Sequence, residues 1–245
     1  SGQRDALPQA GFVFGDSRTR AVFATRKPVT PPRPPPAERR AIVVGAGLAG
    51  SAACERLCAR GWQVTLVERH ARPATEASGN LAGIYMPLLS KDDNIPTRLT
   101  RAAFLFSLAY WQKLDGIEGA QCGVMQLARD AAHAKVQREI ARLWNYPADF
   151  AQWLEPGEAA ALLGSGAPDG AWMFRQGGWA RPGSICASML AACGERLTTV
   201  FGVGTVGIEH HDYQCRVTGV DRSVIAEPPV LVLANGTGAR VFEQA

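Results

Sequence analysis

The chain has 245 residues, 47% of them hydrophobic and 20% charged, which is enough to bury a sizeable core. Its formal net charge of +4 comes from residues 1–40, which hold eight basic and three acidic side chains, so the nearly neutral remainder gives no argument for a polyanionic partner. No apolar run reaches the roughly 18 residues of a membrane span, no secretory signal is visible, and the six cysteines lack a CxxC pair, which together predict a cytoplasmic protein with reduced thiols.

The N-terminal part ends in a proline-rich linker. Residues 28–36 read PVTPPRPPP, a composition that favours a stiff, extended segment and cannot continue a helix or a central strand. We therefore predict that residues 1–38 are the tail of a preceding domain followed by a linker, and that the main domain begins near Arg39.

A β-α-β unit follows the linker. Residues 41–44 form a short apolar run that predicts a buried parallel strand. Residues 48–60 predict a helix that stops at Gly61, and residues 62–68 predict a second strand.

The turn between the first strand and the helix of this unit contains a glycine motif that is typical of dinucleotide binding. Residues 45–50 read Gly-Ala-Gly-Leu-Ala-Gly and match GxGxxG, in which Gly45, Gly47 and Gly50 provide a tight turn, room for a pyrophosphate and close helix packing. Free N–H groups at the helix start attract phosphate. Glu68, 18 residues beyond Gly50, can accept hydrogen bonds from ribose hydroxyls. The unit predicts a dinucleotide site without deciding which dinucleotide binds.

The remaining pattern predicts helices first and then strands. We expect helices at residues 96–113, 131–143 and 158–163, and strands at residues 198–207, 213–218, 223–225 and 230–233.

Two further groups of side chains favour ordinary structural roles. Cys54 and Cys58 lie one helical turn apart and are expected to be buried as small hydrophobes. His210, His211 and Asp212 could suggest a metal, but adjacent residues on a strand point to opposite faces, so no metal site is predicted.

The segments after Glu68 resemble the amine-oxidising flavoproteins, the family of D-amino-acid, glycine and sarcosine oxidases. Residues 77–80, Ala-Ser-Gly-Asn, resemble the Ser-Gly segment that runs beside FAD in that family. Within it, residues 41–236 are most similar to the flavin-dependent C-terminal domain of bifunctional tRNA-modifying enzymes that make 5-methylaminomethyl-2-thiouridine. This narrower resemblance rests on residues 77–80, 87–94, 122–124, 176–179 and 234–236, of which 87–94 is the most specific stretch.

The resemblance implies an α/β fold, with a Rossmann-type FAD-binding domain interrupted by an α+β substrate domain. We expect residues 39–95 and 183–245 to form the discontinuous FAD-binding domain and residues 96–182 to form part of the substrate domain. Family members continue beyond this point with a flavin-contacting segment, so we expect the fold to be incomplete at the C-terminus. Residues 1–27 would be the end of an S-adenosylmethionine-dependent methyltransferase domain.

The resemblance also implies FAD as cofactor and the wobble uridine of tRNA as substrate, with oxidative removal of a carboxymethyl group from carboxymethylaminomethyl-uridine. The flavin does the electronic work, so no catalytic dyad is assigned. The residues expected to bind FAD are Gly45, Gly47, Leu48, Ala49, Gly50, Glu68, Arg69, Ser78, Gly79, Asn80, Val206, Ala234, Asn235 and Gly236. Those expected near the substrate are Lys91, Asp92, Asp93, Asn94, Gly177, Gly178 and Trp179.

Two points stay open in the sequence. The cation that holds the substrate carboxylate is expected among Lys91, Arg98, Arg101, Arg175 and Arg181. The alternative functions are a glycine, sarcosine or D-amino-acid oxidase, and a truncated nucleotide-binding module without turnover.

Overall fold

The computed structural model describes residues 12–14, 21–23, 37–211 and 214–242. The chain divides into two units, Ser1–Ala37 and Glu38–Ala245. In the first unit, β1 (Phe12–Phe14) and β2 (Ala21–Phe23) pair antiparallel. The described residues do not include the predicted linker at 28–36 or most of the predicted domain tail. They also do not include Asp212, which belongs to the His-His-Asp group for which no metal site was predicted.

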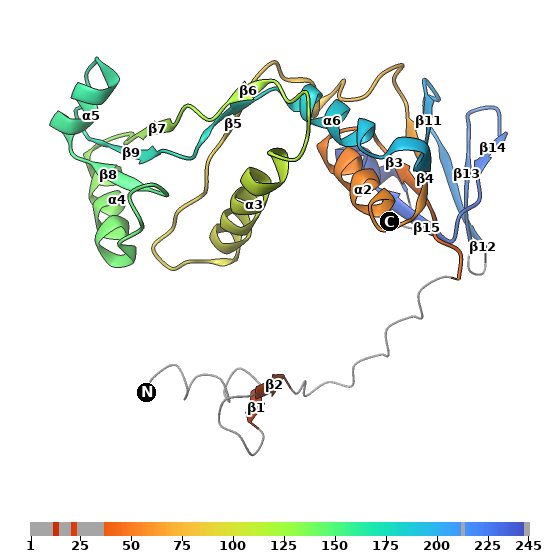
Figure 1. Cartoon of the computed structure of the whole chain (residues 1–245), viewed down its shortest axis with the longest axis horizontal. Coiled ribbons are helices and arrows are strands. Elements are labelled where there is room, and N and C mark those ends of the chain that lie inside the picture. The colour runs from red at the N-terminus through yellow and green to blue at the C-terminus, as the bar shows by residue number, and fades with distance from the viewer. Residues whose placement is uncertain (1–11, 15–20, 24–36, 212–213, 243–245) are drawn as a thin grey trace. The chain divides into compact units, whose positions relative to one another are not determined.

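A four-stranded parallel sheet organises the second unit (Figure 1). Its strands, in the order in which they lie side by side, are β11 (Leu197–Phe201), β4 (Gln63–Glu68), β3 (Arg40–Val44) and β15 (Val230–Leu233). All three neighbouring pairs run parallel. The sheet confirms the predicted α/β class.

The two faces of this sheet are buried by different layers. Val43 and Leu66 point into a cluster that α2 (Leu48–Cys58) covers. Ile42 and Val67 belong to a second cluster with Val217 of an antiparallel sheet. That sheet contains β12 (Gly207–His211), β13 (Gln214–Thr218) and β14 (Val224–Ala226). Burial on both faces explains why the central strands are almost wholly apolar.

Helix α2 also packs against α6 (Pro182–Ala191), which comes from more than a hundred residues later in the chain. Cys54 and Cys58 are buried in this layer, which confirms the prediction made for them. The short 3-10 helices η1 (Ala77–Gly79), η2 (Gly194–Arg196) and η3 (Gly236–Val241) complete the unit around the sheet.

The inserted part of the chain forms two further antiparallel sheets. One has the order β5 (Gly83–Tyr85), β10 (Gly178–Ala180), β6 (Gly119–Ala120); the other has the order β7 (Val124–Leu127), β9 (Ala171–Phe174), β8 (Gln152–Leu154). Its helices are α3 (Ile95–Trp111), α4 (Ala131–Trp144) and α5 (Pro156–Leu163). An aromatic cluster that includes Phe104, Trp172 and Phe174 is its core. Within the described part of the chain, no helix combines the length and apolar character needed to cross a bilayer.

The structure departs from the sequence prediction most clearly after β11. A single strand was expected at 198–207, but β11 ends at Phe201 and the chain turns before β12 begins at Gly207. Gly202 and Gly204 have φ angles of +74° and +66°, in the left-handed region that strands do not use. The sequence analysis also did not predict α6. It missed the strands from β5 to β10 because segments of two to four residues are too short to show a clear alternation.

Candidate functional site

A cavity of about 760 Å³ lies at the carboxyl ends of the parallel strands. Val44, Glu68 and Leu233 line it from the last residues of β3, β4 and β15, and Val203 lines it from the turn after β11. Ligands of open parallel sheets bind at this edge, and the volume falls within the usual range for ligand sites.

Two glycines shape the floor of the cavity. Gly45 has a φ of +102°, and a Cβ there would lie 2.7 Å from the carbonyl oxygen of Ala234. A Cβ on Gly50 would lie 1.8 Å from the carbonyl oxygen of Gly45, so α2 approaches the turn as closely as it does only because this position is glycine. This cradle is what the close approach of a dinucleotide pyrophosphate requires.

The first turn of α2 opens into the cavity. Its N-cap is Gly47, which offers no capping side chain, and the first turn holds no acidic residue. Leu48 N–H donates instead to the hydroxyl of Ser78, 3.0 Å away, from the η1 segment. The positive end of the helix therefore faces a polar wall, where a phosphate is favoured.

Glu68, the last residue of β4, is buried in the wall of the cavity. Its Oε2 accepts a hydrogen bond from Ala46 N–H at 2.8 Å, and its Oε1 accepts one from His70 N–H at 2.9 Å. The backbone of Gly202 to Gly204 donates hydrogen bonds to the carbonyl oxygens of residues 68–70, which joins the turn after β11 to the end of β4. The two backbone donors thus hold the carboxylate at the end of β4, where such an acid accepts hydrogen bonds from the ribose of a dinucleotide.

Glu76 closes another side of the cavity. Its Oε1 lies 2.7 Å from Arg69 Nη2 and 3.0 Å from His70 Nε2. The contact with His70, together with the charge of Arg69, lowers the pKa of the Glu76 carboxyl from its ordinary value. On the wall near β15, the side-chain oxygen of Asn235 is buried and has no hydrogen-bond donor among the described residues.

Most residues predicted to bind FAD lie on this one cavity. Its wall includes Gly45, Gly47, Leu48, Ala49, Glu68, Arg69, Ser78, Val206, Ala234, Asn235 and Gly236. Gly50, Gly79 and Asn80 lie outside the lining, Gly50 because it packs behind the turn. The sequence reasoning missed residues 74–76 and 203–205. The Gly-Val-Gly after β11 was the signal that could have revealed the second segment.

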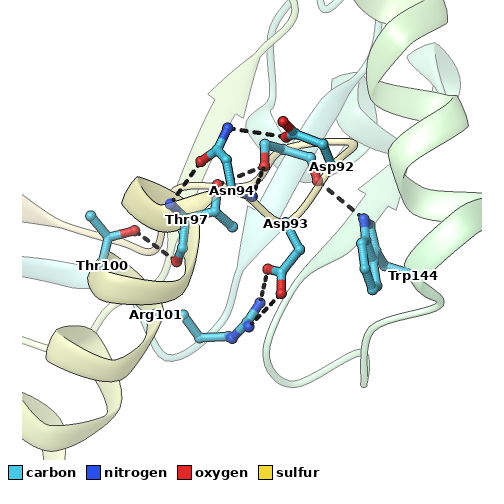
Figure 2. A network of polar contacts seen from close by, with 8 residues as sticks. Asp92, Asp93, Asn94, Thr97, Thr100, Arg101 and Trp144 are labelled. Carbon is cyan, nitrogen blue, oxygen red and sulfur yellow. Dashed lines mark hydrogen bonds and ion pairs between the residues drawn. The ribbon is translucent and has the colours of Figure 1, made fainter. Parts of the chain in front are cut away.

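The predicted substrate loop 90–94 lies elsewhere and is fully engaged with its own surroundings (Figure 2). Asn94 Oδ1 accepts from Thr97 N–H at 3.1 Å and caps α3, while Asp92 Oδ1 accepts from Asn94 Nδ2 at 3.0 Å. Asp93 holds both terminal nitrogens of Arg101, at 2.8 and 3.1 Å, and Arg101 lowers its pKa.

The same loop is also tied to α4. Lys91 Nζ lies 2.7 Å from Glu139. Trp144 (Figure 2) donates from its Nε1 to the carbonyl oxygen of Ser90 at 3.1 Å. The loop therefore joins α3 to α4, and none of its predicted substrate residues lines the 760 Å³ cavity. Their contact with substrate stays a prediction.

The glycines at 177–178 have a steric role that the structure makes visible. A Cβ on Gly178 would lie 2.1 Å from the carbonyl oxygen of Ala120, so glycine is required where β10 pairs with β6. Trp179, its neighbour, is exposed and lies across from Ile84 of β5.

The candidate cations for a substrate carboxylate differ in their partners. Asp93 engages Arg101, Glu118 engages Arg181, Glu139 engages Lys91, and the Gln152 amide engages Arg175. Within the described residues, the Arg98 side chain makes no hydrogen bond or ion pair, although its charge helps Arg101 to lower the pKa of Asp93.

Comparison with known proteins agrees with the geometry of the cavity. Residues 40–245 match the family model of the FAD-dependent oxidoreductases. The chain is 41% identical, over 251 residues, to the tRNA 5-methylaminomethyl-2-thiouridine biosynthesis bifunctional protein MnmC of Paraburkholderia phytofirmans, and 40% identical, over 253 residues, to the protein of the same name from Ralstonia nicotianae. Each alignment includes 96% of this chain, and the chain spans 38% of the length of each relative.

Solved structures share the fold at low identity. Glycine oxidase from Geobacillus kaustophilus superposes with a TM-score of 0.63 and 20% identity, over 82% of this chain and 56% of that one. L-proline dehydrogenase from P. horikoshii gives a TM-score of 0.68 and 17% identity, over 85% and 56% of the two chains.

Proposed function

The chain belongs to the family of FAD-dependent oxidoreductases, and on that premise we propose that it takes part in tRNA modification by oxidising the wobble uridine. The reaction is the oxidative removal of the carboxymethyl group from carboxymethylaminomethyl-uridine or its 2-thio form, which leaves an aminomethyl group. The observation that carries the proposal is the 41% identity, across 96% of this chain, to a protein named for the biosynthesis of 5-methylaminomethyl-2-thiouridine.

The residues of the 760 Å³ cavity suit the dinucleotide half of FAD. The Gly45 and Gly50 cradle would leave room for the pyrophosphate, the positive end of α2 would favour its charge, and Glu68 would accept hydrogen bonds from ribose hydroxyls. Bound FAD supplies hydride acceptance from the carbon beside the substrate nitrogen. The protein contributes position and exclusion of water, and the imine that results hydrolyses to the aminomethyl product and glyoxylate.

The proposal extends to partners and location. A separate S-adenosylmethionine-dependent methyltransferase domain would methylate the aminomethyl product, in keeping with the word bifunctional in the relatives' names. A tRNA substrate implies a cytoplasmic site of action. Arg98 is our candidate for the substrate carboxylate, because its guanidinium makes no hydrogen bond or ion pair with the described residues.

The test is a direct assay on tRNA. The chain loaded with FAD is incubated with tRNA that carries carboxymethylaminomethyl-uridine, and the nucleosides are then separated and weighed by mass spectrometry. We expect the aminomethyl nucleoside and an equal amount of glyoxylate, and no change in tRNA whose wobble uridine is unmodified. An unchanged nucleoside profile from protein with a bound-flavin spectrum would contradict the proposal.

The same preparation distinguishes the alternatives. Peroxide release from glycine or sarcosine, without any change in tRNA, would favour an amino-acid oxidase. A protein that binds no flavin and changes neither substrate would favour a nucleotide-binding module without turnover.

A further inference from the structure

A second cavity, of about 430 Å³, lies between α4 and β8, two elements that pack side by side (Figure 1). Arg138, Ala141, Arg142 and Asn145 line it from the helix side, and their spacing of three and four residues puts them on one face of α4 and its C-cap. The cavity shares no lining residue with the one at the parallel sheet, and the proposed oxidation uses none of its side chains.

Two tryptophan side chains form the strand side of this cavity, and neighbouring side chains fix their positions. The Trp153 ring lies beneath the guanidinium of Arg138, with 5.7 Å between the guanidinium carbon and the ring centroid. Trp172, which is buried, meets Trp153 edge-on at 5.8 Å. Glu155 accepts from Arg138 Nε at 2.8 Å and from Trp153 Nε1 at 3.1 Å, so one carboxylate fixes both groups. A planar ligand can therefore stack here with little further loss of side-chain freedom.

The charge that remains open in the cavity is positive. Glu155 is the single acidic residue of the lining, and Arg138 already neutralises it. Arg142 is exposed, and its side chain makes no hydrogen bond or ion pair with the described residues. Asn145, which ends α4 at a φ of +42°, likewise has a side-chain amide without a partner in the described part of the chain. Both side chains are free to donate to an anion or a carbonyl oxygen.

We propose that this cavity binds one unstacked nucleotide of a single-stranded RNA loop, with its base against Trp153 and its phosphate beside Arg142. Proteins recognise RNA loops by stacking splayed bases on aromatic rings or guanidinium planes and by pairing their phosphates with basic side chains. The site rests on the proposed function, because a wobble uridine lies in a single-stranded anticodon loop, whose other nucleotides are unpaired as well.

The test measures binding of a fluorescent anticodon stem-loop RNA to the full chain over a range of salt concentrations. Arg142→Ala should weaken binding about tenfold at low salt and reduce the slope of log affinity against log salt by about 0.7, the value for one phosphate contact on a single strand. Trp153→Leu should weaken binding by a similar factor and leave the salt slope unchanged, since stacking releases no counterion.

The matched control is Arg129→Ala, which removes the same charge from an exposed position just before α4 and outside the cavity. Equal loss of affinity in the Arg129 and Arg142 variants would overturn the proposal, and so would a parent chain that does not bind the RNA. Duplex RNA or polyglutamate that competes as well as the stem-loop would overturn it too. Arg142-dependent binding without any nucleoside oxidation would contradict the proposed function alone, whereas oxidation without Arg142-dependent binding would contradict this site alone.

Discussion

Two regions of the molecule differ in how far they bury their apolar side chains. In the parallel-sheet region, made of β3, β4, β11, β15 and α2, the central strands are buried on both faces, and Leu66 is fully inaccessible. In the α3 region, made of α3 with β5 and β10, large apolar side chains remain exposed: Ile84 is 72% and Leu99 is 67% exposed. Only Thr97 and Phe104 of α3 are buried.

The contrast separates what holds the fold from what lies on its surface. A fully buried leucine contributes through transfer from water and through close packing, whereas an exposed one contributes little in the described structure. Exposed apolar surface of this extent commonly marks a contact region. The parallel sheet should therefore carry most of the stability that mutation can remove.

The largest expected effect comes from truncating a leucine in each region. Leu66→Ala should lower the free energy of unfolding by about 2–5 kcal/mol, because it leaves a cavity in a packed core. Leu99→Ala should change it by less than about 0.5 kcal/mol. Urea unfolding measures both, and equal losses in the two variants would break the comparison.

A somewhat smaller effect is expected from filling the glycine cradle. Gly50→Ala puts a Cβ against the Gly45 carbonyl and should cost about 1–3 kcal/mol of stability, together with much of the FAD affinity. Gly166→Ala, whose Cβ would meet nothing within 4 Å, is the control. Flavin absorbance of the purified variants reports the outcome; full FAD content in the Gly50 variant would argue against the cradle.

The junction between the regions gives a pH-dependent effect. The ring of Tyr110 on α3 lies beneath the guanidinium of Arg56 on α2, with 4.6 Å between the ring centroid and the guanidinium carbon. Burial raises the pKa of Tyr110 to about 12, and the Glu55 carboxylate adds to the rise. A raised folded-state pKa gives stability that is present below the unfolded value of about 10 and is lost as the pH rises toward 12.

Tyr110→Phe removes this titration. The stability of the parent relative to the variant should be constant below pH 10 and should fall between pH 10 and 12, as measured by urea unfolding at each pH. A difference that stays flat across this range would show that the hydroxyl is not held in a buried setting.

The smallest expected effect concerns the loop at residues 90–94, which precedes α3. Arg101 lowers the pKa of Asp93, so the pair should stabilise the fold above the unfolded pKa of about 3.9 and lose this contribution as the pH falls through the folded value. The parent and Asp93→Asn should therefore differ at pH 7 and converge in acid. Thermal unfolding can follow this; variants that run parallel at all pH values would refute it.

The sequence predicted the parallel-sheet region better than the rest because its signals are local. The apolar run at 41–44, the glycines after it and Glu68 lie within 30 residues and determine each other's positions. The 203–205 wall of the cavity was hidden inside one expected strand, since alternation alone does not show where two positive φ angles break it.

The loop at residues 90–94 shows a different limit of prediction from sequence. Asp92, Asp93 and Asn94 carry groups suited to a substrate, and the sequence could not show that their partners would be a helix start and Arg101. Such pairings depend on a turn at Asp93, whose φ of +44° is uncommon for a residue other than glycine. The second cavity could not be predicted either, because it lies between α4 and a three-residue strand that is too short to show a hydrophobic pattern.

The contact between Gly45 and Ala234 also sets an order in time. These residues are about 190 positions apart, and β15 must pair with β3 before the wall against the glycine turn exists. A ribosome that adds about 5–20 residues per second needs roughly 10–40 s to cover that stretch. The glycine turn of a nascent chain is therefore made long before the wall that faces it, and we expect FAD to be retained only after Ala234 has been made and β15 has paired with β3.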